Sequence, residues 1–259
     1  MLALKLGLSL ASSNGVGGSD AFLLDEYTGA AVAYSLRKLK STTTNVVRVR
    51  RSSDNAELDF TATDITDGTL TTWTGANDGL VTVWYDQSGG ENAVQITASK
   101  QPTIVSTGVV ELMDGTPALN FDISDLMTTV TARSWSTAFI NAQSLAKRII
   151  NYVLYNLGSG GIFWNGTYPG VDGLGVFDVA VISSLTGEDL LPHLGYFNLT
   201  GTTWSIGKDG ATATDFTSGV AIPFKDIGRG DLNITGYVQD VILYTSTQSA
   251  NRAAIEALL

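Results

Sequence analysis

The sequence contains no cysteine and a single histidine, and these two shortages remove several classes of site. Without cysteine there is no disulfide framework, no thiolate nucleophile and no zinc–cysteine site. A serine–histidine–aspartate triad would have to use His193, and no G-x-S-x-G nucleophile elbow is present. The sequence therefore predicts no cofactor and no catalytic triad, and we assign no metal ligand. Calcium bound by carboxylates of the Asp-rich loops stays open, although no EF-hand spacing is present.

Basic residues are also scarce. The chain has 15 lysines and arginines against 25 aspartates and glutamates, which gives a formal net charge of −10. Because phosphates would be repelled on average, we expect no nucleic-acid partner. The short run of Arg48, Arg50 and Arg51 is interpreted as the solvated face of an edge strand. No apolar run approaches the roughly 18 residues of a membrane span, so no membrane partner is expected.

The first residues alternate between leucine and other residues, which is typical of a β-strand with one apolar face. The alternating positions are Leu2, Leu4, Leu6, Leu8 and Leu10. The stretch Ser12–Asp20 that follows is small, polar and glycine-rich, as in a flexible linker. We therefore predict two parts: residues 1–20 as a docking arm with its tether, and residues 21–259 as the folded domain.

Two helices are predicted, one near each end of that domain. Asp25–Lys40 begins with a capping aspartate, contains several alanines and ends with basic residues, which suits the helix dipole. Ser249–Leu259 has a serine as its cap and places Ile255 and Leu258 on one face.

Between the helices the chain is read as short strands separated by turns. The 28 glycines, together with Asp, Asn and Ser, supply the turns. The predicted strands are Asn45–Arg51, Gly79–Tyr85, Pro117–Phe121, Ile149–Leu157, Gly175–Ile182, Thr203–Gly207 and Gly236–Tyr244. This pattern predicts an all-β fold, a two-sheet sandwich or jelly roll with short helices near each end.

The most distinctive segment is GLVTVWYDQSGGENAVQI, residues 79–96. One hypothesis places a sugar against Trp84 or Tyr85, with Asp86 and Asn92 accepting hydrogen bonds from its hydroxyls. The other is a rigid turn packed inside the fold, in which Asp86 and Ser88 bind turn amides and the glycines adopt positive φ.

A second candidate sugar site lies further along the chain. Trp164, Asn165 and Tyr168 fall in a segment interpreted as a loop, WNGTY. An aromatic ring next to an amide can hold the C–H face and the hydroxyls of a sugar. Tryptophans of sandwich domains also pack in the core, so both interpretations stay open.

Several segments together resemble one known set of proteins. They are AAVAYSLRKL, VVRVRRSSDNAELDF, VTVWYDQSGGENAVQ, QPTIV with DGTPALNFD, and the tail GYVQDVILYTSTQSANRAAIEALL. The set resembles bacteriophage virion proteins with a concanavalin A-like (laminin G-like) sandwich. A more distant likeness, through RRSSD and YDQSG, extends to arabinofuranosidase B-type catalytic domains. The likeness covers Asp25 to about Asp122 and Gly236–Leu259, and residues 123–234 match in general character.

The hydrolase resemblance implies two catalytic carboxylates in that divergent middle region. Among the glutamates, Glu188 lies there, beside Asp189, in the setting LTGEDLLP. We find no recognisable nucleophile motif around it and interpret the pair as a solvated loop. We therefore assign no catalytic residue and expect the chain not to be an enzyme.

The resemblance implies a structural protein of a phage virion, in the tail, in a fibre or as a capsid decoration. We expect it to assemble as a homo-oligomer and to dock on other virion proteins through the arm. A host-surface glycan is an additional expected partner. The alternatives that stay open are a glycan-binding adhesion module and an arabinofuranosidase-like glycoside hydrolase.

Overall fold

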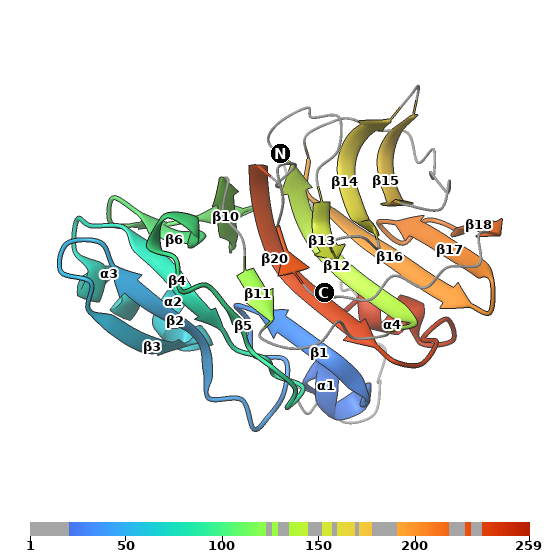
Figure 1. The fold of residues 1–259 in the computed structure, drawn as a ribbon. Helices are drawn as coiled ribbons and strands as arrows, with labels where there is room; N and C mark the ends of the chain where they lie inside the picture. Colours follow the sequence, from blue (N-terminus) through green and yellow to red (C-terminus); the bar gives the residue numbers. More distant parts are fainter. Residues whose placement is uncertain are drawn as a thin grey trace, which may run out of the picture.

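The chain folds into antiparallel β-strands that form a sandwich with a few short helices, as seen in a computed structural model (Figure 1). The residues that the structure describes are 21–122, 126–128, 135–144, 152–156, 160–168, 171–177, 191–217, 226–228 and 235–259. Strand pairings join 18 strands into one continuous sheet, and β8 and β9 form a separate hairpin. The continuous sheet folds over so that two halves pack face to face.

The first half is built around β20, and we call it the β20 sheet. On one side β20 pairs with β1 and β10, and on the other side with β12, which leads to β16, β17 and β18. These strands are β1 (Ala30–Ser35), β10 (Leu119–Asp122), β12 (Thr137–Ser144), β16 (His193–Thr200), β17 (Thr203–Lys208), β18 (Thr214–Thr217) and β20 (Thr235–Tyr244).

The second half is built around β4, and we call it the β4 sheet. It runs in the order β3-β2-β4-β5-β11-β19-β13-β14-β15, and β6 pairs with β4, β7 and β10. These strands are β2 (Asn45–Arg51), β3 (Glu57–Thr61), β4 (Gly79–Trp84), β5 (Ala93–Val94), β6 (Thr103–Ser106), β7 (Val109–Val110), β11 (Leu126–Thr128), β13 (Tyr152–Asn156), β14 (Gly160–Tyr168), β15 (Val171–Phe177) and β19 (Asp226–Ile227). The separate hairpin is β8 (Leu112–Met113) with β9 (Thr116–Pro117), and η1 (Ala98–Lys100) is a single 3-10 turn.

The main core lies between the two sheets. One cluster of buried side chains draws Val81 and Trp84 from β4 together with Val238 and Val241 from β20. Because side chains alternate along a strand, each sheet gives one face to this core. The predicted all-β sandwich is confirmed.

A second apolar cluster covers the outer face of the β20 sheet. It contains Leu23 of α1 (Leu23–Glu26), Ile255 of α4 (Arg252–Glu256), and Phe139 and Tyr244 of the sheet. The rings of Phe139 and Tyr244 meet edge to face, with centroids 6.3 Å apart. The strands in the middle of this sheet are therefore buried on both faces, which explains why nearly every residue of β20 is buried.

The helix predicted for residues 25–40 is wrong. The segment contains the last two residues of α1 and then strand β1, which pairs antiparallel with β20 from Ala30 to Ser35. Because Val32, Ala33 and Tyr34 are buried on both faces of the sheet, the strand reads as a continuous apolar run. A run of this kind cannot be distinguished from a buried helix by its periodicity.

At the other end the helix prediction was nearer the structure. Helix α4 spans Arg252–Glu256, so it is shorter than predicted, and neither Ser249 nor Asn251 caps it through a side chain. Two short helices were missed, α2 (Ala62–Thr66) and α3 (Thr69–Thr74). Thr61 and Asp64 form a capping box at α2, so the T-x-x-D spacing was a usable signal.

The strand predictions held better. β2 occupies the predicted residues Asn45–Arg51, and β4, β17 and β20 differ from the predictions by one residue at an end. However, β2 lies between β3 and β4, so the prediction of an edge strand was wrong. The predicted docking arm, with Leu2, Leu4, Leu6, Leu8 and Leu10, lies outside the described residues. Among the described helices, none has the length and apolar character needed to cross a membrane.

Candidate functional site

The turn that follows β4 is built by the carboxylate of Asp86. Oδ1 accepts hydrogen bonds from the backbone N–H of Ala33 at 2.6 Å and of Ser88 at 3.2 Å. Oδ2 accepts from the Ser88 hydroxyl at 2.7 Å and from the backbone N–H of Gly90. Gly89 adopts a positive φ of 93°, which a glycine permits without strain. The aspartate thus organises one tight turn and ties it to β1.

The next residue, Gln87, fixes the same turn to the connection between β1 and β2. Its side chain is buried; Oε1 accepts a hydrogen bond from Leu39 N at 2.7 Å. Nε2 donates to the carbonyl oxygens of Ser35, at 3.0 Å, and Arg37, at 2.7 Å. Backbone groups of a non-repetitive segment need such partners when they are buried. The side chain of Gln87 therefore replaces a strand ladder at this point.

These contacts correct part of the predicted sugar site. Trp84 is 0% exposed and packs against Tyr34 at 5.7 Å between ring centroids, so it has no surface to offer a ligand. The lone pairs of Asp86 are occupied within the turn. Asn92 is exposed, and its Oδ1 accepts from Asp86 N at 3.0 Å. The hypothesis of a rigid turn describes Trp84 and Asp86 correctly.

Tyr85, by contrast, lines an open pocket of about 370 Å³, which we call the Tyr85 pocket. Its lining residues are Lys40, Thr42, Thr43, Thr44, Asn45, Tyr85, Asp86, Gln87 and Gly89. The pocket lies between the β1–β2 connection and the turn that Asp86 and Gln87 hold in place.

The polar groups of the Tyr85 pocket fall into two sets. Asp86 and Gln87 are committed to backbone groups, as described above. In the described part of the chain, the side chains of Lys40, Thr42, Thr44 and Asn45 have no hydrogen-bond partner and no ion-pair partner. Several uncommitted donors and acceptors beside a half-buried phenol ring suit a polyhydroxylated ligand.

The hydroxyl of Tyr85 belongs to an ionic cluster on the outer face of β2 and β3. It donates to Asp59 Oδ1 at 2.7 Å, and Arg48 donates to both Asp59 oxygens, at 2.7 and 3.0 Å. The hydrogen bonds from Arg48 lower the pKa of Asp59, whereas burial, with the bond to Asp59, raises the pKa of Tyr85 to about 12. At neutral pH Asp59 is ionised and Tyr85 is a hydrogen-bond donor.

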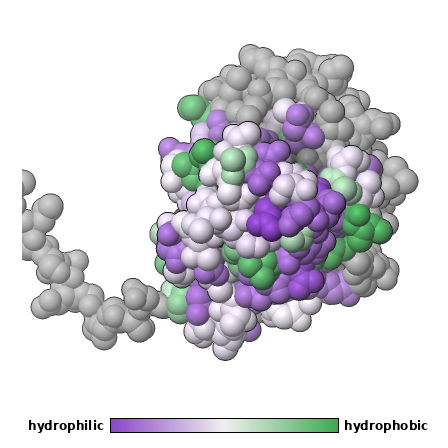
Figure 2. Space-filling view, turned by 90° about the vertical axis from the view of Figure 1, so that its left-hand side faces the viewer, coloured by the Kyte–Doolittle hydropathy of each residue, from purple (hydrophilic) through white to green (hydrophobic). Residues whose placement is uncertain are grey.

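This ionic cluster lies in a strongly polar surface. Figure 2 is viewed from the side on which β2, β3 and β4 lie, and it shows hydrophilic residues gathered across the middle of this face. Arg50 adds to this surface through bonds to Gln101 and Asn55, each at 2.7 Å. Arg48, Arg50 and Arg51 are each partly buried and each hydrogen-bonded to a neighbouring side chain, so the predicted solvated face is in fact a partly covered one.

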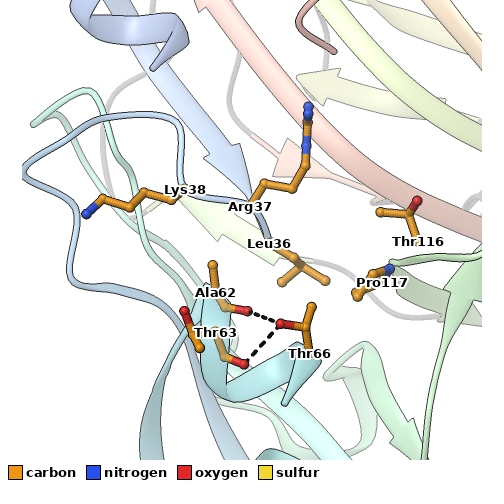
Figure 3. Close-up of a pocket in the computed structure, with 8 residues that line it drawn as sticks. All are labelled: Leu36, Arg37, Lys38, Ala62, Thr63, Thr66, Thr116 and Pro117. Carbon is orange, nitrogen blue, oxygen red and sulfur yellow. Dashed lines mark hydrogen bonds between the residues drawn. The ribbon is translucent and has the colours of Figure 1, made fainter. Parts of the chain in front are cut away.

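A further pocket of about 280 Å³ lies between the start of the β1–β2 connection, α2 and β9 (Figure 3). Figure 3 shows the charged ends of Arg37 and Lys38 pointing away from it. Arg37 binds Asp240 and the carbonyl oxygen of Leu258, and the Lys38 ammonium lies 5.2 Å from the ring centroid of Phe22. Leu36 and Pro117 leave a mainly apolar lining, so this pocket carries no polar site.

Trp164, Asn165 and Tyr168 lie in strand β14, which pairs with β15, so the predicted loop is wrong. The pairing register shifts between Phe163 and Gly166, and such an irregularity obscures the alternation that marks a strand. The placement of these side chains, and of Glu188 with Asp189, lies outside what the structure describes. Their proposed roles therefore stay predictions.

The single histidine has a structural setting. His193 begins β16, and its Nδ1 lies 2.7 Å from Asp209 Oδ2, while Asp209 Oδ1 accepts from Leu194 N at 2.9 Å. Asp209 has a φ of 50° in the turn after β17. The pair joins the start of β16 to this turn.

No protein-family model matches the sequence, and no curated protein does. Among solved structures, a mutant of a GH54 α-L-arabinofuranosidase soaked with 4-nitrophenyl α-L-arabinofuranoside has a TM-score of 0.68 at 13% identity, over 91% of this chain. The match spans 63% of that enzyme's length. Domain 4 of AbnA, a GH43 arabinanase from Geobacillus stearothermophilus in complex with arabinotriose, gives 0.44 at 8% identity, over 89% and 98% of the two chains. A sialidase from Trypanosoma rangeli has a TM-score of 0.43 at 12% identity, and the match covers 68% of this chain and 30% of the sialidase.

The first comparison contradicts the expectation that the chain is not an enzyme, because the structure that shares its fold is that of a glycoside hydrolase. The expectation that the chain is not an enzyme rested on the single histidine and on the missing nucleophile motif. A glycosidase needs neither, since two carboxylates brought together by the tertiary structure suffice. This comparison gives no support to a virion protein.

Proposed function

We propose that this chain is a carbohydrate-active protein, an arabinofuranosidase-like glycoside hydrolase. The observation that carries the proposal is the likeness in fold to the GH54 arabinofuranosidase, at a TM-score of 0.68 over 91% of the chain. The Tyr85 pocket adds support, because its uncommitted hydroxyl, amide and ammonium groups suit a sugar. In this proposal the pocket binds the glycan on which the enzyme acts.

Hydrolysis of a glycosidic bond needs an ionised carboxylate and a protonated one. The hydrogen bonds that Asp25, Asp54, Asp59 and Asp67 accept lower the pKa of each of these carboxyl groups. They are in the ionised state of a nucleophile, not in the protonated state of a general acid. For the acid we propose Glu188, in place of the solvated loop inferred from the sequence, because among the glutamates it lies in the divergent region where the hydrolase resemblance implies the catalytic carboxylates.

Release of 4-nitrophenol from 4-nitrophenyl α-L-arabinofuranoside is the expected activity. Glu188→Gln should lower kcat by about a thousandfold on an alkyl arabinofuranoside, whose leaving group must be protonated, and much less on the nitrophenyl substrate, whose leaving group departs as a stable anion. Glu26→Gln is the matched control, since Glu26 is exposed and its one hydrogen bond in the described part of the chain is with Tyr27. Absence of turnover by the unmodified protein on a broad panel of nitrophenyl glycosides would exclude the hydrolase.

A second candidate function is a structural role in a phage virion, which the sequence resemblance over residues 25–122 and 236–259 favours. In that case residues 1–20 dock on a neighbouring protein, and the protein is a homo-oligomer. An antibody against the chain should label purified particles, and a chain that lacks residues 1–20 should fold without joining them. Unlabelled particles that lack the chain by mass spectrometry would contradict this role.

A further inference from the structure

The Tyr85 pocket adjoins a second pocket of about 220 Å³ across the turn at Ser88 and Gly89. The second pocket is lined by Leu24, Asp25, Thr28, Gly29, Ala30, Lys40 and Ser88. Lys40 belongs to the lining of both pockets. Because the two pockets share Lys40 as a lining residue, we refer to them together as the groove; their combined space exceeds that of a single sugar ring.

The ammonium group of Lys40 forms no ion pair within 4 Å in the described part of the chain, although its charge, after the hydrogen bonds from Ser41, helps to lower the pKa of the nearby Asp25. No ion pair or hydrogen bond of its side chain is present there, whereas Arg48 and Arg51 are each paired with an aspartate at 2.7 Å. Asp25 shares the second pocket with Lys40, but its carboxylate accepts a hydrogen bond from Ser41 N at 2.9 Å. Lys40 is partly buried, so its charge is less screened than that of a fully exposed lysine.

The other charged group that lines the Tyr85 pocket is the carboxylate of Asp86, which is surrounded by hydrogen-bond donors. The negative charge of Asp86 is stabilised by the backbone N–H groups of Ala33, Ser88 and Gly90. The hydroxyl of Thr44 and the amide of Asn45 line the same pocket as Lys40, and their side chains have no partner among the described residues. The groove thus presents one cation and neutral polar groups beside two carboxylates, Asp25 and Asp86, whose oxygens already accept hydrogen bonds from the protein.

We propose that this groove selects an acidic glycan, with the carboxylate of a uronic-acid residue bound to Lys40 and the ring hydroxyls bound to Thr44 and Asn45. A hydrogen bond in which both partners are charged is roughly twice as strong as a neutral one. A carboxylate is therefore the sugar substituent that Lys40 should bind most strongly. The inference rests on the proposed function, of which it specifies the ligand class.

Isothermal titration with digalacturonate and with the matched neutral digalactose tests this. We expect the acidic disaccharide to bind about tenfold more tightly, a difference of about 1.4 kcal/mol. Lys40→Met should abolish this preference, and Asn45→Ala should weaken binding of both sugars. Lys38→Met is the matched control, because Lys38 lies two residues away and does not line the groove. Unchanged thermal unfolding must accompany each variant.

The outcomes separate the two proposals. Equal affinity for the two sugars, unaffected by Lys40→Met, overturns the selectivity for acidic glycans and leaves glycan binding in place. If the protein turns over the arabinofuranoside but binds neither disaccharide, the proposal that the groove binds acidic glycans is wrong and the proposed hydrolase activity stands. Failure of both binding and turnover removes both proposals. A preference lost equally in Lys38→Met and Lys40→Met reflects general surface charge and also overturns the assignment.

Discussion

Replacing Gln87 by leucine is expected to destabilise the protein by about 4 kcal/mol, because each buried group left without its hydrogen bond costs roughly 1–3 kcal/mol. The substitution retains most of the volume but strands three backbone groups, those of Leu39, Ser35 and Arg37. Denaturant unfolding followed by tryptophan fluorescence measures the loss. We expect the midpoint to fall without a large change in the slope.

Asn92→Ala serves as the control for this prediction. Asn92 is exposed, and it accepts one hydrogen bond, from Asp86 N, at the same turn. Its loss should cost about 1 kcal/mol or less, as for one ordinary hydrogen bond. Equal destabilisation by the two substitutions would contradict the view that Gln87 holds the β1–β2 connection in place.

Replacing Arg37 by methionine is the second change with a large expected effect. The guanidinium Nη2 lies 3.2 Å from both oxygens of Asp240, whose side chain is 1% exposed. Removing one partner of a buried pair costs about 3–5 kcal/mol, because an uncompensated charge remains. Since the Arg37 side chain is 37% exposed, we expect about 3 kcal/mol, the lower end of that range. Thermal and denaturant unfolding measure it.

A double substitution distinguishes the buried charge from lost packing. In Arg37→Met with Asp240→Asn, no carboxylate remains, so part of the stability should return. Arg48→Met is the comparison for a more exposed pair, since the side chains of Arg48 and Asp59 are 42% and 29% exposed, and its cost should stay near 1 kcal/mol or below. If Arg37→Met were as mild as Arg48→Met, the pair with Asp240 would have no special role.

Much of the sandwich could be predicted from the sequence, because apolar and polar residues alternate visibly along strands that are buried on one face, such as β2. The error at β1 arose where both faces of the β20 sheet are covered. There the pattern depends on the distant helices α1 and α4, and local periodicity carries no information on them.

The candidate site was located in part. The sequence pointed to residues 79–96, and that segment does border the Tyr85 pocket; of the two hypotheses for it, the rigid turn fits Trp84 and Asp86 and the sugar site does not. Strand alternation places Trp84 inward and Tyr85 outward, which the sequence alone left undecided. Lys40, Thr44 and Asn45 could not be found, because they reach the pocket through hydrogen bonds that Gln87 makes across about 50 positions of the chain.

The position of β20 in the fold has a consequence for synthesis of the protein. This strand supplies the partner of β1, β10 and β12, yet it spans Thr235–Tyr244 near the C-terminal end of the sequence. Loops of more than 200 residues close when β1 meets β20, and such long-range pairing is slow. On the ribosome, β1 must wait without its neighbour until residue 244 has emerged. Its apolar face is a target for chaperones during that interval.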